Sequence, residues 1–422
     1  MTRQNTVIKN KKSRSITYFA MRHYVSIFLV MFVVIFLVDT YQNHSSMNSV
    51  FYFPNEPPWL PDSIKAIPIT GQHFFGDFQL PWVMAKGNPF SQENPFNNIL
   101  PLGYLPYILL SGIELKIAFM FYSLITIVIY VFSIKVFSKI ESFSVFELVP
   151  IMLFNISIFW CLDRGAAVLM VTSLFFLSVQ VLYRKSKNHL FNHFTYFLIA
   201  FCLSAKIYLL AAIFLLVVGQ IIKLRPLVFI ITYFALGNIF FSYLYTGPVA
   251  AAKQILFSLL HATGDGLTNV ASIWCVNFAS DFVKVAAHLN LDTHSTKIDV
   301  ALLSVLSLVL SVLIILKYKN TGITIMMSLS MIEFVATVSY RYTTIWALYG
   351  FILVTKSQYF QKIREGNSYT YRSLLVSLLL ALFPLPLALC WTIPASWLFT
   401  NLLLLFENTV ASASRKTRQS VG

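Results

Sequence analysis

Twelve apolar segments recur along the chain, and they constrain its fold more than any other feature. They lie near 24–40, 113–134, 146–161, 165–183, 194–205, 207–222, 227–246, 299–316, 322–339, 343–356, 373–391 and 395–410. Several reach the roughly 17–20 residues that a helix needs to cross a bilayer core. Hydrophobic residues make up 57% of the 422 residues and charged residues 11%, and a soluble core could not absorb so much apolar surface. We therefore expect an all-α, polytopic integral membrane protein with about 10–12 transmembrane or half-spanning helices.

Basic residues flank these segments asymmetrically, which indicates the orientation of the chain. A basic arm, residues 1–23, precedes the first segment, and no small-x-small cleavage site follows it, so we expect an uncleaved first span and a cytoplasmic N-terminus. Alternate threading from there puts most of the 31 Lys and Arg residues on the inner side. It predicts one transmembrane domain at 24–410, outer loops at about 41–112 and 247–298, and a cytoplasmic tail at 411–422.

The same charge distribution bears on partners and location. The net charge of +15 would suggest nucleic acid in a soluble chain, but here it lies in short loops and serves as a topology signal, so we expect no nucleic-acid partner. The composition is rich in Lys, Asn, Ile and Phe and leans toward a bacterial inner membrane.

Lys206 alone separates the segments 194–205 and 207–222. We expect two short or broken helices that meet at this lysine, because irregular backbone at membrane depth is tolerated only against protein or a polar cavity. A charge at that depth is expensive unless it is paired or lines a wet cavity, so Lys206 becomes a candidate functional residue, together with Glu333.

Residues 70–110 are polar, aromatic and rich in proline, unlike most of the chain. Asp77 lies there among Phe75, Gly76 and Phe78, away from other charges. Threading brings Asp77 to the same outer face as Asp163-Arg164, Lys206 and 340–342, which contains Arg341. A carboxylate can take a proton from a hydroxyl nucleophile, and Lys or Arg can hold a phosphate leaving group. This set suits transfer from a lipid phosphate, with Lys206, Arg164 and Arg341 as the candidates that bind the donor phosphate.

Each of these residues also has a plainer interpretation. Asp77 would then be an ordinary solvated loop acid, and Lys206 and Glu333 would pair with partners inside the helix bundle. Asp163-Arg164 would be a turn whose arginine extends toward the membrane surface.

Candidate residues for the acceptor come from both outer loops. In the second loop, residues 249–261 fit an amphipathic helix lying on the membrane, followed by a turn at 264–266. His261, Asp265 and Asn269 are candidates there, with an ordinary loop role as the alternative. Tyr104 in the first loop offers an aromatic face on which a sugar or prenyl chain could pack.

Several short runs in the first loop resemble a known family. They are G-D-F at 76–78, A-K-G-N-P-F at 85–90 and L-G-Y-L-P at 102–106. They resemble the first outer loop of the GT-C glycosyltransferases, and most of all the family 87 polyprenyl-phosphate-mannose-dependent enzymes, whose loop reads roughly D-F, a small helix, G-x-P-Y and Y-x-P-P. Looser matches follow in the same order at 164–165, 204–208, 268–272 and 338–342. The resemblance implies a GT-C-like fold, Asp77 as general base, inversion of the anomeric centre and transfer without a metal.

The chain also departs from that pattern. Phe90 stands in place of the loop tyrosine, Tyr107 replaces the second of the paired prolines, and Arg341 occupies the place of the usual histidine. Leu203 and Leu209 stand where the family has Ala and Pro around the lysine. The donor sugar and the acceptor therefore stay open, with a mannosyl-type hexose favoured by the resemblance.

The resulting prediction is an inverting glycosyltransferase that moves a sugar from a polyprenyl-phosphate donor to a lipid or glycan acceptor on the outer face. No cofactor is expected, because the chain has no Walker loop, dinucleotide fingerprint, zinc spacing or G-x-S-x-G elbow, and its four cysteines are scattered singly. Two other classes stay open. A lipid-linked oligosaccharide flippase or transporter would favour internal repeats and acids in mid-span, and an O-antigen-type polymerase or ligase would favour essential outer-loop arginines.

Overall fold

The structure, a computed structural model, describes residues 23–25, 27–30, 76–87, 99–140, 149, 151–153, 155, 158, 161–162, 167–184, 188–246, 296–334, 345–356, 368–383 and 392–419. The regular elements in these ranges are all helical, which confirms the predicted all-α class for this part of the chain. In the first half they are α3 (Gly76–Lys86), η2 (Pro101–Tyr104), α4 (Leu105–Leu110), α5 (Leu115–Ile140), α8 (Ala167–Arg184), α9 (His189–Ala205), α10 (Leu209–Val218) and α11 (Leu224–Thr246). In the second half they are α14 (Thr296–Tyr318), α15 (Thr321–Phe334), α16 (Trp346–Lys356), α18 (Ser368–Leu382) and α19 (Thr392–Gln419).

Side-chain caps define where two of the helices, α9 and α15, begin. The side-chain oxygen of Asn188 accepts the amide of Phe191 at 3.2 Å at the start of α9. The Asn320 side chain accepts the amides of Gly322 and Ile323 at 2.8 and 3.3 Å at the start of α15. Such caps satisfy amides that the first helical turn leaves without a partner.

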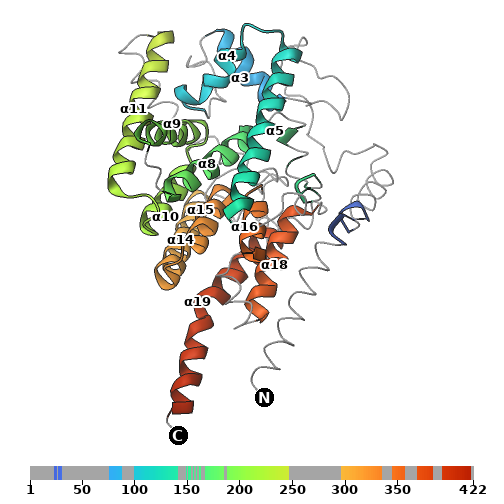
Figure 1. The fold of residues 1–422 in the computed structure, drawn as a ribbon, viewed down its shortest axis with the longest axis vertical. Helices are drawn as coiled ribbons and strands as arrows, with labels where there is room; N and C mark the ends of the chain where they lie inside the picture. Colours follow the sequence, from blue (N-terminus) through green and yellow to red (C-terminus); the bar gives the residue numbers. More distant parts are fainter. Residues whose placement is uncertain are drawn as a thin grey trace.

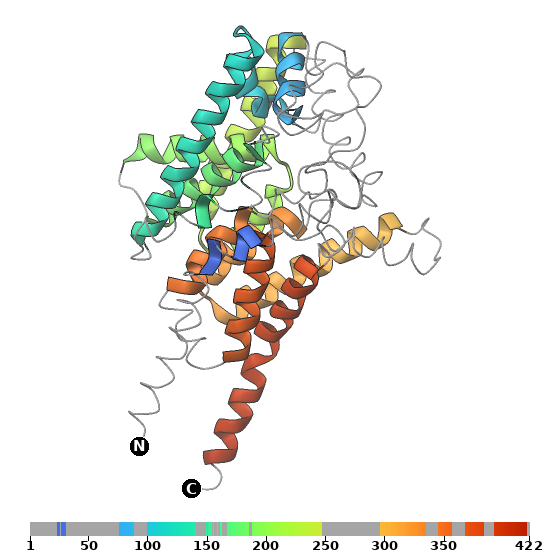
Figure 2. The same cartoon turned by 90° about the vertical axis from the view of Figure 1, so that its right-hand side faces the viewer.

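The helices are arranged along one long axis. Figure 1 shows α3 and α4 at one end of this axis and the C-terminal half of α19 at the other, and Figure 2 agrees from the side. Between these ends α10 packs against α14 and α15, while α16 packs against α15 and α18. Helices α3 and α4 are therefore far from the basic C-terminal turns of α19.

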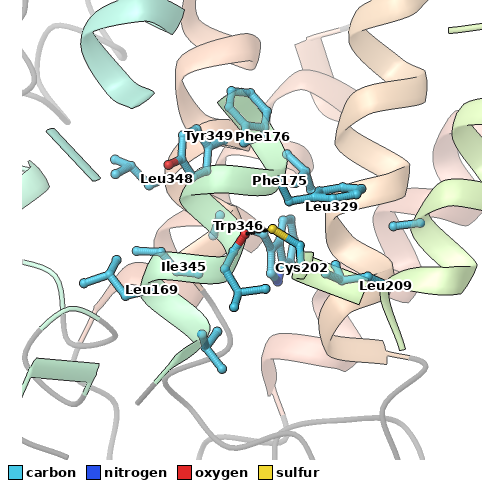
Figure 3. Packing of buried hydrophobic residues seen from close by; sticks show 14 of the residues in the cluster. Leu169, Phe175, Phe176, Cys202, Leu209, Leu329, Ile345, Trp346, Leu348 and Tyr349 are labelled. Carbon is cyan, nitrogen blue, oxygen red and sulfur yellow. Dashed lines mark hydrogen bonds between the residues drawn. The ribbon is translucent and has the colours of Figure 1, made fainter. Parts of the chain in front are cut away.

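A buried polar contact joins the two halves of the chain in the core. The hydroxyl of Tyr349 in α16 lies 2.6 Å from Ser133 Oγ of α5 and donates to Ser173 Oγ of α8 at 3.3 Å. The ring of Phe176 lies 4.1 Å from the Tyr349 ring. Figure 3 shows these rings in the same buried cluster as Trp346 and Cys202, to which α8, α9 and α16 contribute. A buried hydroxyl with partners on two other helices fixes how these helices pack.

Two helices in the described part of the chain are long and apolar enough to cross a membrane, Leu115–Phe137 in α5 and Leu224–Leu244 in α11. Other predicted spans give shorter helices, such as α15 with 14 residues and α16 with 11. On α5 the side chains of Met120, Leu124, Val128 and Phe132 are 69%, 58%, 58% and 52% exposed. Soluble monomers rarely expose such continuous apolar surface, so the two helices support association with a membrane.

Candidate functional site

Asp77 is the second residue of α3, within the predicted outer loop. Its neighbour Phe78 is fully buried, and the Phe78 ring lies 4.8 Å from that of Tyr122 in α5 and 5.7 Å from that of Tyr107 in α4. Aromatic rings at these separations attract each other beyond the effect of burial. The first turn of α3, and with it the backbone of Asp77, is thereby fixed against α4 and α5. The side chain of Asp77 lies outside the described residues.

The rest of α3 is fixed through its last two turns. Trp82 is almost fully buried, and its indole N–H donates to the carbonyl of Leu110 at 2.9 Å. The Lys86 ammonium lies 3.8 Å from the centroid of the Trp82 ring, a cation–π contact. Pro81 has no amide hydrogen, so the carbonyl of Asp77 receives no helical hydrogen bond from that position.

The 100–104 turn, which consists of Leu100 and η2, connects α3 to the larger helices. Tyr104 in this turn is 1% exposed and its hydroxyl donates to Met84 Sδ of α3 at 3.5 Å. Burial raises the pKa of the Tyr104 phenol, and the neighbouring Tyr107 raises it further, so the group stays neutral. The sequence placed Tyr104 among the acceptor or loop candidates, and the structure places it in the packing between η2 and α3.

The predicted helix break at Lys206 is confirmed. Lys206 follows α9 with an extended backbone, φ −146° and ψ 93°, and α10 begins three residues later. Its amide donates to the carbonyl of Cys202 at 2.9 Å, and its carbonyl accepts the amide of Leu209 at 3.1 Å. Both backbone groups of Lys206 are thus bonded at the break, and its side chain is half-buried. We call residues 204–208 the helix break.

The 100–104 turn lies directly on this helix break. The amide of Leu100 donates to the carbonyl of Ser204 at 2.9 Å. A Cβ atom added to Gly103 would lie 2.8 Å from both N and Cα of Ala205, closer than real Cβ atoms come to backbone. The close approach therefore requires glycine at position 103, and it brings the turn against the residue that precedes Lys206.

Asn238, in the middle of α11, completes this contact. It is 1% exposed; its Oδ1 accepts the amide of Leu102 at 3.0 Å, and its Nδ2 donates to Ser204 Oγ at 2.8 Å and to the carbonyl of Phe234 at 2.7 Å. Sequence reasoning did not single out Asn238. The sequence did contain a signal, a lone side-chain amide within an apolar segment. Because buried polar groups are nearly always hydrogen-bonded, such an amide implies a partner on another element.

The structure connects the elements that carry two of the predicted site residues, and most of the other candidates lie outside the described residues. Through the turn it links α3, which carries Asp77, to the helix break, which carries Lys206. Glu333 lies in α15, and its side chain is outside the described residues. The remaining candidates lie wholly outside the described residues: Asp163, Arg164, His261, Asp265, Asn269 and Arg341. The amphipathic helix predicted at 249–261 also lies outside them.

Two further observations bear on the identity of the site. Within the ranges that the structure describes, no group of three or more His, Cys, Asp or Glu residues is placed to hold a metal ion. Comparison of the chain with models of protein families, with curated proteins and with solved structures gave no match in any of the three.

Proposed function

We propose that this chain is a polytopic membrane glycosyltransferase. It transfers a sugar, with inversion, from a polyprenyl-phosphate donor to a lipid or glycan acceptor at the outer membrane surface. In this proposal the fold is GT-C-like, Asp77 is the general base and Lys206 binds the donor phosphate. Arg164 and Arg341 assist at the phosphate, and the second outer loop contributes to the acceptor side.

The observation that carries the proposal is the contact between the 100–104 turn and the helix break. The turn is bonded to Ser204 through Leu100 and is joined to α3 through Tyr104 and Met84. An acid and a lysine separated by more than a hundred residues in the sequence therefore belong to elements held by one short turn. A general base and a phosphate-binding cation must be held in fixed relation for transfer to be efficient.

The proposed orientation is supported by the shape of the molecule. Helix α3 lies at one end of the long axis, and the turns of α19 that contain Arg415, Lys416 and Arg418 lie at the other (Figure 1). Basic residues favour the cytoplasmic side. The exposed apolar faces of α5 and of α11, where Leu236 and Phe240 are exposed, then contact acyl chains, and α3 faces outward.

The chemistry follows from these roles. The acceptor hydroxyl oxygen attacks the anomeric carbon and forms the new glycosidic bond, while the bond from that carbon to the donor phosphate oxygen breaks. The phosphate leaves with the electron pair, and Lys206 stabilises its added negative charge. The hydroxyl proton passes to the Asp77 carboxylate.

The experiment that tests this proposal is transfer of labelled sugar from a panel of polyprenyl-phosphate donors to a membrane lipid extract. Purified wild-type protein is compared with Asp77→Asn, which keeps the size of the side chain but accepts no proton. Glu114→Gln is the matched control, because Glu114 is an exposed acid just before α5. We expect transfer to fall by roughly two or more orders of magnitude in Asp77→Asn only.

Two outcomes would overturn the proposal. Transfer by Asp77→Asn at the wild-type rate would make Asp77 an ordinary loop acid. Wild-type protein that is inert across the donor panel would favour the flippase or transporter, or the polymerase or ligase.

A further inference from the structure

We infer that Asn238 is a positioning residue that fixes Lys206 relative to α3. Asn238 is hydrogen-bonded to Leu102, Ser204 and Phe234, and it acts by holding the 100–104 turn on the helix break. As a role in transfer, the inference rests on the proposed function, whereas the contact on which it depends can be tested without any activity.

The first step concerns the geometry of the amide. Both hydrogens of Nδ2 are used, one for Ser204 Oγ and one for the carbonyl of Phe234, while Oδ1 accepts from Leu102. Rotating the amide by half a turn would point its NH2 group at the amide of Leu102 and lose all three bonds. The network therefore defines the orientation of Asn238.

The second step follows the network to the lysine. Ser204 Oγ accepts from Asn238 and donates to the carbonyl of Ala200, one turn earlier in α9, at 2.9 Å. The carbonyl of Ser204 accepts the amide of Leu100. Ser204 therefore bonds to α11 through its side chain and to the turn through its backbone, two residues before Lys206.

The third step concerns the packing around these bonds. Gly237 precedes Asn238, and a Cβ there would lie 2.9 Å from Leu102 Cδ2. The α11 backbone therefore lies close to the turn at the level of Asn238. With Gly103 against Ala205, the turn is enclosed between α9 and α11, and both helices pack against η2. A displacement of the turn is transmitted to α3 through the Tyr104–Met84 bond and through α4, which follows the turn directly and packs against α3.

The test uses Asn238→Leu, which keeps the side-chain size and removes all three bonds. We expect kcat/KM for the donor to fall by about tenfold to a hundredfold, as expected for a displaced phosphate-binding group. The control is Asn401→Leu, because Asn401 is also buried, at 4% exposed, but lies in α19. Asn401→Leu should leave kcat/KM within about twofold of wild type.

A double-mutant cycle separates positioning from a general loss of structure. If Asn238 acts through Lys206, Asn238→Leu should have little further effect on kcat/KM in the Lys206→Met background. An equal loss of kcat/KM in both backgrounds would overturn the positioning role. If Asn238→Leu does not fold, Ser204→Ala replaces it, because this change removes only the hydroxyl that Asn238 contacts.

A second experiment, which does not depend on transfer activity, measures amide hydrogen exchange in peptides that cover residues 99–104. We expect exchange at Leu102 to accelerate at least tenfold in Asn238→Leu and to stay unchanged in Asn401→Leu. Unchanged exchange in Asn238→Leu overturns the inference whatever the transfer assay gives. If wild-type protein is inert, the proposed function and the role in transfer fail together. Faster exchange in that case still supports Asn238 as the residue that holds the turn on the break.

Discussion

Gly103→Ala is the substitution whose effect the structure defines most closely. The added Cβ would lie 2.8 Å from Ala205 N, from Ala205 Cα and from Ile99 Cγ2. Ordinary van der Waals contact for a Cβ begins at 3.4 Å, so the turn would have to move by about 0.6 Å, the difference between 3.4 and 2.8 Å. Two of the three obstructing atoms belong to the backbone of the helix break, which cannot move aside as the end of a side chain can.

The expected loss of stability has two parts. Overpacking of a well-packed site destabilises by about 1–3 kcal/mol. The shift also stretches the bonds from Leu100 to Ser204 and from Leu102 to Asn238, now 2.9 and 3.0 Å long, toward the limit of hydrogen bonding. Each such bond contributes about 1 kcal/mol net, and stretching without breaking loses about half of that for each bond. We therefore expect Gly103→Ala to lower the free energy of unfolding by about 2–4 kcal/mol.

The assay is unfolding of the purified protein in mixed micelles by titration with a denaturing detergent. Gly112→Ala is the matched control, because a Cβ there meets nothing within 4 Å. Gly237→Ala is an intermediate case, since its Cβ would be closest to the flexible end of the Leu102 side chain. The reasoning is refuted if the free energy of unfolding of Gly103→Ala lies within about 0.5 kcal/mol of that of Gly112→Ala, the size of an ordinary surface substitution.

Three other substitutions test the packing of the remaining helices by the same unfolding assay. Gly219→Ala should destabilise by about 1–3 kcal/mol, because its Cβ would overlap the side chain of Thr324, and Thr324→Ala should restore part of the loss. Thr400→Val should lower the free energy of unfolding by about 1 kcal/mol, because the Thr400 hydroxyl lies 2.7 and 2.9 Å from the hydroxyls of two serines in α18. The same change at the exposed Thr232 should lower it by less, and an equal loss at both positions would contradict this reasoning. Gln220 has φ 59°, a left-handed backbone conformation that glycine adopts more easily than glutamine, so Gln220→Gly should raise the free energy of unfolding by about 0.5 kcal/mol. A loss of stability would show that this conformation carries no strain.

The helix break could be predicted from the sequence because its signal is local. A lysine between two apolar segments indicates that a continuous lipid-facing helix is unfavourable there. The start of α9 was harder to predict, because the apolar segment begins near residue 194 whereas the helix begins at His189. Asn188 caps the more polar first turn of the helix, and His193 Nδ1 lies 3.1 Å from the hydroxyl of Tyr233 in α11. Tertiary contacts therefore extend α9 beyond its apolar part.

The role of Asn238 could not be predicted, because its key partner is distant in the sequence. The bond to Leu102 joins residues 136 positions apart, and nothing in either apolar segment specifies that they meet. Tyr104 illustrates the same limit. A tyrosine in a polar, aromatic loop suggested contact with a ligand, yet its hydroxyl donates to Met84 Sδ of α3.

The position of the turn leads to a kinetic distinction between the residues of the proposed site. Asp77 is joined to the turn through α3, and Lys206 through the helix break, so a change in the turn would displace the proposed base and the proposed phosphate-binding group relative to each other. Asp77→Asn removes the proton acceptor and leaves the contact between turn and break in place. It should lower kcat with little change in donor KM, because an interaction made only in the transition state is lost. Gly103→Ala and Asn238→Leu displace Lys206 in the ground state as well, so they should raise donor KM in addition to lowering kcat.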